Sequence, residues 1–223
     1  MQSIINWRDY DAGFVRKRYN RLARIFVLFE WMFWLPGGIR KVAVERLDLP
    51  HGGRVLEIGC GTGRNLSLLA EAVGREGHVY GVDISEGMLG EARELCERKG
   101  YGNVTLVQSD AAQYAVPEKV DGVLFSLSYA TMSHHKEVLR HAWNQLRAGG
   151  WLVIMDAKLP NGIPGKITRL CLPFFVLTLR LTVLGNPFIV PADELRAVAS
   201  DVEYEEFSFG TYFICRAKKK ADS

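Results

Sequence analysis

From Gly53 onward, short runs rich in β-branched residues alternate with longer runs of helical periodicity. Parallel strands need crossover helices between them, so this alternation predicts an α/β fold with a parallel sheet. Ser85 is the expected N-cap of the second helix, and Gly149 and Gly150 are expected to end the third. The expected strands are residues 54–59, 78–83, 103–110, 120–128 and 150–157, with 202–209 and 210–218 as an antiparallel closing pair, and the expected helices are 65–73, 85–99, 135–147 and 192–200.

The chain has 223 residues, of which 48% are hydrophobic and 24% charged, so one domain can bury a sizeable core. Its four cysteines form no C-x-x-C pair, which predicts neither a metal site nor a disulfide framework. The apolar stretches at residues 22–36 and 170–185 are short and interrupted, and the N-terminus does not have the order of a secretory signal. We therefore expect a cytoplasmic protein with no transmembrane helix.

The net charge of +3 is unevenly distributed along the chain. Residues 1–45 carry a net charge of +4, residues 157–192 carry +4 without a single acid, and the remainder carries −5. Two interpretations account for this pattern equally well. The cations belong to the solvated faces of ordinary helices, or they form a surface that rests on anionic lipid or takes a lipophilic acceptor. The small total does not favour nucleic acid as a partner.

A glycine-rich turn follows the first expected strand and carries Gly59, Gly61 and Gly63. Such a turn lets the backbone approach a ligand closely, and the helix after it supplies N–H donors. The third glycine of the dinucleotide fingerprint is replaced here by Arg64, which disfavours an NAD-linked oxidoreductase. With Glu57 two residues ahead of the first glycine, the spacing resembles the E-x-G-x-G-x-G loop of class I S-adenosylmethionine-dependent methyltransferases.

The resemblance extends over about residues 50–157 and implies a Rossmann-like fold: a seven-stranded, mostly parallel sheet with an antiparallel last strand and helices on both faces. It implies S-adenosylmethionine as the cofactor. Asp83 ends the second strand, where a carboxylate can accept hydrogen bonds from both ribose hydroxyls. The alternative is that Asp83 is simply an acid near the N-terminus of the next helix. Asp110 and the N–H of Ala111 are expected at the adenine, unless Asp110 only forms a turn. The expected cofactor-binding residues are Glu57, Gly59, Cys60, Gly61, Gly63, Asn65, Asp83, Ile84, Met88, Asp110, Ala111 and Ser126.

The loop after the fourth strand lies, in this fold, beside the reacting methyl group. Alignment of an already activated carbon supplies most of the catalysis, so a dedicated base is optional. An ammonium or quinol acceptor must nevertheless lose a proton. The candidate catalytic residues are Tyr19, Tyr129, His134, His135 and Asp156. Either histidine alternatively caps the helix that begins near residue 135.

Residues 14–26 resemble the lid helix of soluble bacterial phospholipid N-methyltransferases and of ubiquinone/menaquinone C-methyltransferases. Tyr19 matches the first aromatic residue of that lid, whereas Phe26 and Val27 stand where those families commonly have Tyr-Asp. We expect residues 1–45 to form lid and membrane-facing helices. Residues 46–223 are then the methyltransferase domain, with an apolar acceptor cover at about 158–191.

These features predict a methyltransferase acting on a lipophilic or membrane-held small molecule. A lipid head-group amine is the first expectation, and C-methylation of an isoprenoid quinone precursor is the alternative, followed by an amine or thiol metabolite. A cofactor-binding, membrane-surface protein without turnover is the non-enzymatic alternative. The expected partners are the acceptor and an anionic membrane surface, with peripheral attachment to its inner face; no nucleic acid and no metal are expected.

Overall fold

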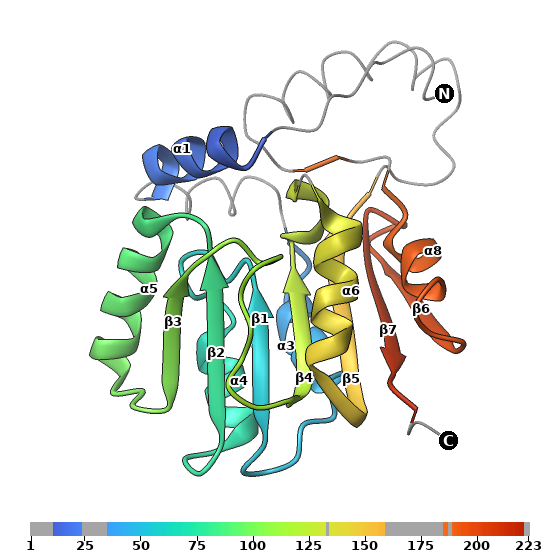
Figure 1. The fold of residues 1–223 in the computed structure, drawn as a ribbon, viewed down its shortest axis with the longest axis horizontal. Coiled ribbons are helices and arrows are strands. Elements are labelled where there is room, and N and C mark those ends of the chain that lie inside the picture. The colour runs from blue at the N-terminus through green and yellow to red at the C-terminus, as the bar shows by residue number, and fades with distance from the viewer. Residues whose placement is uncertain (1–10, 24–34, 133, 159–184, 187–188, 221–223) are drawn as a thin grey trace.

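The computed structural model describes residues 11–23, 35–132, 134–158, 185–186 and 189–220. A seven-stranded sheet with the order β3-β2-β1-β4-β5-β7-β6 forms its centre (Figure 1). The strands are β1 Arg54–Ile58, β2 His78–Asp83, β3 Val104–Gln108, β4 Val120–Ser126, β5 Leu146–Ala157, β6 Val202–Phe207 and β7 Tyr212–Lys218.

Strands β1 to β5 pair in parallel, whereas β7 is antiparallel to both of its neighbours, β5 and β6. Of the seven strands, β7 alone therefore runs against the others. This topology confirms the predicted Rossmann-like fold with a mostly parallel sheet and an antiparallel last strand. The carboxyl ends of β1 to β5 consequently share one edge of the sheet, which is where open α/β sheets bind ligands.

Helices cover both faces of the sheet and create two cores. On one face, α6 and α8 pack against side chains such as Leu56 and Ile58; on the other, α3, α4 and α5 pack against side chains such as Val55. Every residue of β4 is buried, as expected for a central strand that is covered on both sides. The helices are α1 Ala12–Leu22, α3 Ile39–Glu45, α4 Leu66–Val73, α5 Glu86–Lys99, the 3₁₀ helix η3 Tyr129–Thr131, α6 His135–Gln145 and α8 Pro191–Arg196.

The start of β5 differs from the prediction. The preceding helix α6 ends at Gln145 and the strand begins at Leu146, so Gly149 and Gly150 lie inside the strand rather than ending the helix. A Cβ atom on Gly150 would lie 2.6 Å from the carbonyl oxygen of Asp121 on β4. The glycine thus permits a close approach of two strand backbones, a requirement that local sequence does not reveal. The predicted helix 192–200 is likewise shorter, at residues 191–196.

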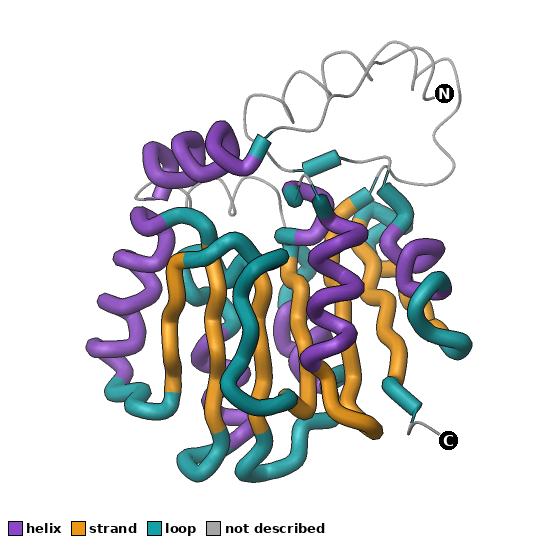
Figure 2. The backbone as a smooth tube through the Cα atoms, viewed as in Figure 1, coloured by secondary structure: helices purple, strands orange, loops and turns teal. Residues whose placement is uncertain are grey.

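The N-terminal helix α1 lies across the edge formed by the strand ends and their loops (Figure 2). Asp11 is its N-cap and accepts a hydrogen bond from the Phe14 N–H at 2.9 Å. Phe26 and Val27 of the predicted lid lie outside the described residues, as does most of the predicted acceptor cover. Within the described residues, none of the helices is long and apolar enough to cross a bilayer.

Candidate functional site

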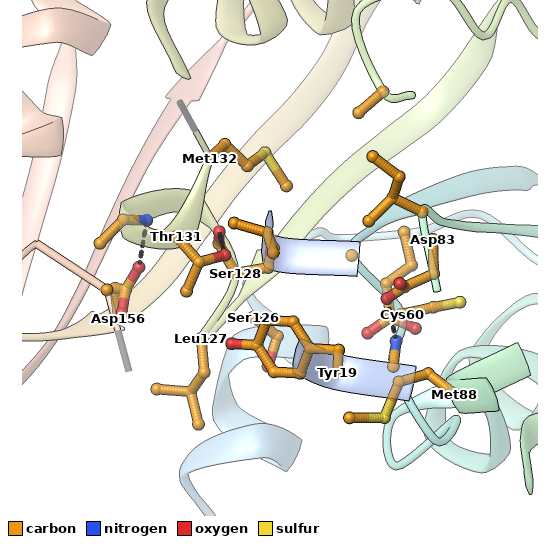
Figure 3. Close-up of a pocket in the computed structure, with 18 of the residues that line it drawn as sticks. Tyr19, Cys60, Asp83, Met88, Ser126, Leu127, Ser128, Thr131, Met132 and Asp156 are labelled. Carbon is orange, nitrogen blue, oxygen red and sulfur yellow. Dashed lines mark hydrogen bonds between the residues drawn. The ribbon is translucent and has the colours of Figure 1, made fainter. Parts of the chain in front are cut away.

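A pocket of about 290 Å³ opens at the carboxyl ends of the parallel strands and extends beneath α1 (Figure 3). This volume is near the lower end of the range for small-molecule sites, which is roughly 300–1,000 Å³. All of the residues predicted to bind the cofactor line it except Gly63. A Cβ atom on Gly63 would lie 2.8 Å from Cδ1 of Leu66 and 3.2 Å from Cβ of Ala92. Gly63 therefore allows α4 and α5 to pack closely.

The first two glycines of the turn form part of the pocket wall. Gly59 and Gly61 have φ angles of 72° and 53°, a left-handed backbone conformation that residues other than glycine rarely adopt. A Cβ atom on Gly59 would lie 2.5 Å from Cβ of Ser128, whereas one on Gly61 would meet no described atom within 4 Å. Gly59 thus lets the loop after β4 approach, and Gly61 leaves its backbone accessible to a ligand.

Asp83 at the end of β2 is fixed by backbone amides. Its Oδ2 accepts a hydrogen bond from the Gly61 N–H at 2.8 Å, and its Oδ1 accepts one from the Ser85 N–H at 2.9 Å. Burial raises the pKa of Asp83, and backbone hydrogen bonds from Ser85, Gly61 and Ile84 oppose that rise. The carboxylate is therefore held rigidly at the mouth of the glycine turn.

Asp110 and Ala111 lie at the end of β3 and line the same pocket. The Oδ1 atom of Asp110 accepts a hydrogen bond from the Ala112 N–H at 2.9 Å, which is an Asx turn. Asp110 thus has the turn-forming role that was the alternative to a ligand contact, while it remains part of the pocket wall.

A polar network runs behind the glycine turn. The Asn65 side-chain amide donates to Oε1 of Glu57 at 2.5 Å, and Arg40 donates to Oδ1 of Asn65 at 3.3 Å and to Oγ of Ser126 at 3.1 Å. Burial raises the pKa of Glu57 to about 7, although the Asn65 hydrogen bond and the Arg40 charge lower it. Oε2 of Glu57 and Oγ1 of Thr62 are buried and have no hydrogen-bond partner among the described residues. Both residues line the pocket, so a polar ligand can satisfy these two atoms.

The far side of the pocket carries Asp156, at the end of β5. This buried carboxylate accepts hydrogen bonds from the N–H groups of Ala130 at 3.1 Å and Ala157 at 2.8 Å. Burial raises the pKa of Asp156 to about 6, although these two hydrogen bonds lower it. At neutral pH the group is mostly ionised and can still accept a proton.

Tyr19 of α1 reaches into the pocket between the Asp83 and Asp156 sides (Figure 3). Burial, followed by the charges of Asp83 and Asp156, raises the pKa of the Tyr19 phenol, and a hydrogen bond with Thr131 opposes this rise. The phenol consequently stays protonated at neutral pH and is a hydrogen-bond donor there rather than a base.

Besides Asp156, the four other predicted catalytic residues separate into two pairs. Tyr19 and His134 line the pocket, whereas Tyr129 and His135 do not. The Tyr129 hydroxyl donates to Oε2 of Glu194 at 2.5 Å, and Nε2 of His135 lies 3.1 Å from Oε1 of the same carboxylate. Tyr129 of η3 and His135 of α6 therefore both contact α8 through Glu194. His134 occupies the N-cap position of α6, and its side chain makes no capping hydrogen bond in the described structure.

Arg40 and Thr62 are among the pocket residues that sequence reasoning missed. Arg40 lies on α3, which precedes β1 and belongs to no motif, so only the tertiary structure brings it to Asn65 and Ser126. Thr62 lies between Gly61 and Gly63, and this position inside the glycine turn could have identified it as a pocket residue.

Comparison with known proteins points to the same class of protein as the glycine turn. Residues 55–150 match the model of a methyltransferase-domain family. An S-adenosylmethionine-dependent methyltransferase from Aquifex aeolicus shares the fold with a TM-score of 0.61 at 18% identity, over 94% of this chain and 98% of that one. The family match and the shared fold support the resemblance to class I S-adenosylmethionine-dependent methyltransferases that the glycine turn indicated, a class whose cofactor is S-adenosylmethionine.

Among curated proteins, the demethylmenaquinone methyltransferase of Listeria welshimeri is 34% identical over 127 residues, which are 56% of this chain and 53% of that enzyme. The chain thus spans about half the length of the curated relatives it matches. A Haemonchus contortus phosphoethanolamine N-methyltransferase, solved with phosphomonomethylethanolamine and S-adenosylhomocysteine, has the same fold with a TM-score of 0.65 at 17% identity, over 83% of this chain and 53% of that one. The relatives' names are consistent with the quinone alternative and do not test phospholipid N-methylation.

The raised pKa of Glu57 predicts how the free energy of unfolding depends on pH. A carboxyl group that ionises near pH 7 when folded and near 4.5 when unfolded contributes stability at low pH and loses it as the pH rises through 7. In the absence of cofactor, the unfolding free energy of the wild type should fall by roughly 1–3 kcal/mol more than that of Glu57→Gln between pH 5 and 8. Urea unfolding at several pH values measures this difference. Parallel pH curves for the two proteins would contradict it, and Glu97→Gln, at an exposed position of α5, is the matched control.

Proposed function

We propose that this chain binds S-adenosylmethionine in the strand-end pocket and transfers its methyl group to a lipophilic or membrane-held small molecule. The observation that carries the proposal is the composition of the pocket wall. On the glycine-turn side lie the fixed carboxylate of Asp83 and two buried polar atoms, of Glu57 and Thr62, that have no partner among the residues the structure describes, and the carboxylate of Asp156 lies on the opposite side. The remaining wall includes apolar side chains such as Val15, Leu35 and Met132.

The chain's own residues fit this cofactor. In our proposal, Oε2 of Glu57 and Oγ1 of Thr62 bind its polar methionine end, where an ammonium group also offsets the buried charge of Glu57. Asp83 accepts from the ribose hydroxyls, and the Asp110–Ala111 turn contacts the adenine. When bound, the cofactor supplies a methyl carbon that its sulfonium has already activated.

The residues of the opposite side prepare the acceptor. Tyr19 and Val15 of α1 exclude water from the pocket, which strengthens electrostatic interactions inside it. Asp156 accepts the acceptor's proton, since its pKa of about 6 leaves it ionised but basic at neutral pH. His134 is the second candidate for that proton transfer, because it also lines the pocket.

We favour an aromatic carbon of a quinol-type acceptor. The names of the curated relatives support this choice, and so does a buried carboxylate able to take a phenolic proton. A lipid head-group amine is the second candidate, since a buried carboxylate such as Asp156 also attracts an ammonium group and then accepts its proton. The fold shared with a phosphoethanolamine N-methyltransferase is compatible with that candidate.

A membrane-held acceptor is consistent with the surface around the pocket mouth. The turn between β6 and β7 lies beside the carboxyl end of β5, because Tyr212 pairs with both Ala157 and Phe207. Phe209 at this turn is 98% exposed and has a φ of 56°. An exposed aromatic residue at the same strand-end edge of the sheet as α1, whose exposed cations include Lys17 and Arg21, suits an anionic lipid interface. We propose that residues 1–45 act as the lid on this side and that residues 158–191 cover the acceptor.

Cofactor affinity tests the role of Asp83. Replacing the carboxylate in Asp83→Asn should weaken S-adenosylhomocysteine binding roughly 10- to 100-fold, or about 1.5–3 kcal/mol, because a charged hydrogen-bond acceptor is lost. Calorimetry measures the affinity, with the exposed Glu97→Gln as control. A 2′-deoxy analogue should weaken binding to the wild type and barely affect the variant. Equal affinity of wild type and Asp83→Asn would refute the ribose contact.

Methyl transfer tests the acceptor and the base together. Purified protein with labelled cofactor should methylate a demethylquinol, and the rate should rise through about pH 6 as Asp156 ionises. Asp156→Asn should lower the rate roughly 10²- to 10⁴-fold and remove that pH dependence, while His134→Asn has a smaller effect. Mass spectrometry identifies the product. Methylated phosphatidylethanolamine instead would select the second candidate, and tight cofactor binding without any product would favour the non-enzymatic alternative.

Vesicle binding tests the surface at the pocket mouth. Co-sedimentation with anionic vesicles should occur at low salt and weaken near 0.5 M, where screening shortens to roughly 4–5 Å. Phe209→Ser and Lys17→Gln should each reduce binding, whereas Lys220→Gln, at the far end of β7, should not. Binding that is absent, or equal in all of these variants, would contradict the lipid-surface role.

A further inference from the structure

The inner face of α1 contributes to the pocket, although few side chains of the helix are buried. Ala12, Val15 and Tyr19 line the pocket, at the spacing of one helical face. Within α1, every residue of which the structure describes, only Val15 is buried. A helix with so few buried side chains is expected to open easily unless polar contacts hold it.

Such contacts come from Asn20, the residue after Tyr19. Its Oδ1 accepts a hydrogen bond from the Ser85 hydroxyl at 2.7 Å and another from the Gly87 N–H at 2.9 Å. The Gly87 N–H belongs to the first turn of α5, where helical N–H groups have no partner inside the helix. Asn20 thus replaces a capping interaction that water would otherwise supply.

Gly87 also fits this contact sterically. A Cβ atom at position 87 would lie 3.1 Å from both Cα and the carbonyl oxygen of Asn20. Because these are backbone atoms of another helix, any side chain at position 87 pushes α1 outward. The glycine therefore allows α1 to reach the first turn of α5.

The contact is continuous with the pocket. Ser85, the N-cap of α5, accepts from the Met88 N–H at 3.2 Å with its hydroxyl and donates its own N–H to Oδ1 of Asp83 at 2.9 Å. One residue therefore joins the lid helix to the carboxylate that we assign to the ribose. A displacement of α1 removes Tyr19 from the pocket and one hydrogen-bond partner from Ser85.

We propose that Asn20 is a positioning residue that latches α1 onto the first turn of α5, holds Tyr19 over the pocket and sets the rate at which the bound nucleoside leaves. The effect on release rests on the proposed function, because it requires the nucleoside to occupy this pocket. The latch itself does not, since its contacts lie within the chain.

Two variants break the latch by different means. Asn20→Ala removes the acceptor and raises the helix propensity of α1, while Gly87→Leu keeps the acceptor and displaces α1 by volume. Asn20→Asp retains an acceptor and places a negative charge at the N-terminus of α5, so it should preserve the latch. Gly90→Leu is the matched control on the same helix, because a Cβ atom there meets nothing within 4 Å among the described residues.

Hydrogen exchange of the full chain without ligand tests the latch. The amides of residues 12–22 should exchange roughly 5- to 100-fold faster in Asn20→Ala and Gly87→Leu, the factor expected for two net hydrogen bonds. Combining the two changes should add little to either, since both break the same contact. Asn20→Asp and Gly90→Leu should exchange like the wild type. Unchanged exchange of α1 in both latch variants would overturn the proposal.

Stopped-flow dissociation of S-adenosylhomocysteine tests whether the latch controls the release of the bound nucleoside. Its release should accelerate by a similar factor in Asn20→Ala and Gly87→Leu, and Asn20→Asp should restore the wild-type rate. Faster exchange of α1 with unchanged release would overturn the assigned control of release. A wild type that binds no S-adenosylhomocysteine would instead refute the proposed function, and hydrogen exchange would still decide whether the latch exists.

Discussion

The site depends on keeping charged groups at the buried ends of parallel strands, where water is scarce. Desolvation penalises an isolated carboxylate heavily, and only hydrogen bonds or opposite charges compensate for it. Asp83 and Asp156 both meet this requirement with two backbone N–H groups, one from their own segment and one from a neighbouring loop. Each carboxylate therefore fixes a loop as well as facing the pocket. The glycine turn and the loop after β4 are positioned by the same groups that we propose to contact cofactor and acceptor.

Sequence predicted the parts of the site that local pattern and α/β topology determine together. Asp83 and Asp110 were placed correctly at one edge because each follows a strand, and parallel strands end at a common edge. Ser85 was placed as an N-cap because the hydroxyl precedes a helical period. Arg40 and Asn20 could not be found in this way. Their partners lie 25 or more residues away along the chain, and no spacing rule links a helix before β1 to the end of β4 or α1 to α5.

Tyr129 and His135 show how tertiary packing separates neighbours in sequence. Both flank the loop that lines the pocket, and residue type alone gives them the same claim to a catalytic role as His134. The decisive partner is Glu194 on α8, 59 residues beyond His135, which draws both side chains toward the helix. Gly63 is a similar case. It belongs to the same glycine spacing as Gly59 and Gly61, which line the pocket, but its own close contacts are with α4 and α5.

The pKa values of three pocket carboxyl groups are raised together, and this favours one order of binding for cofactor and acceptor. Burial raises the pKa of Glu57, Asp83 and Asp156 alike, so each is costly to ionise while no cation lies beside it. A positively charged cofactor on the Glu57 side lowers that cost for Glu57 first and, at longer range, for the others. In the proposed function the cofactor should therefore bind before the acceptor, since its charge favours the ionised form of the base that the acceptor requires. Because Ser85 joins Asp83 to Asn20 and α1 lies over the same pocket, a nucleoside bound there and the latch that we propose should stabilise each other.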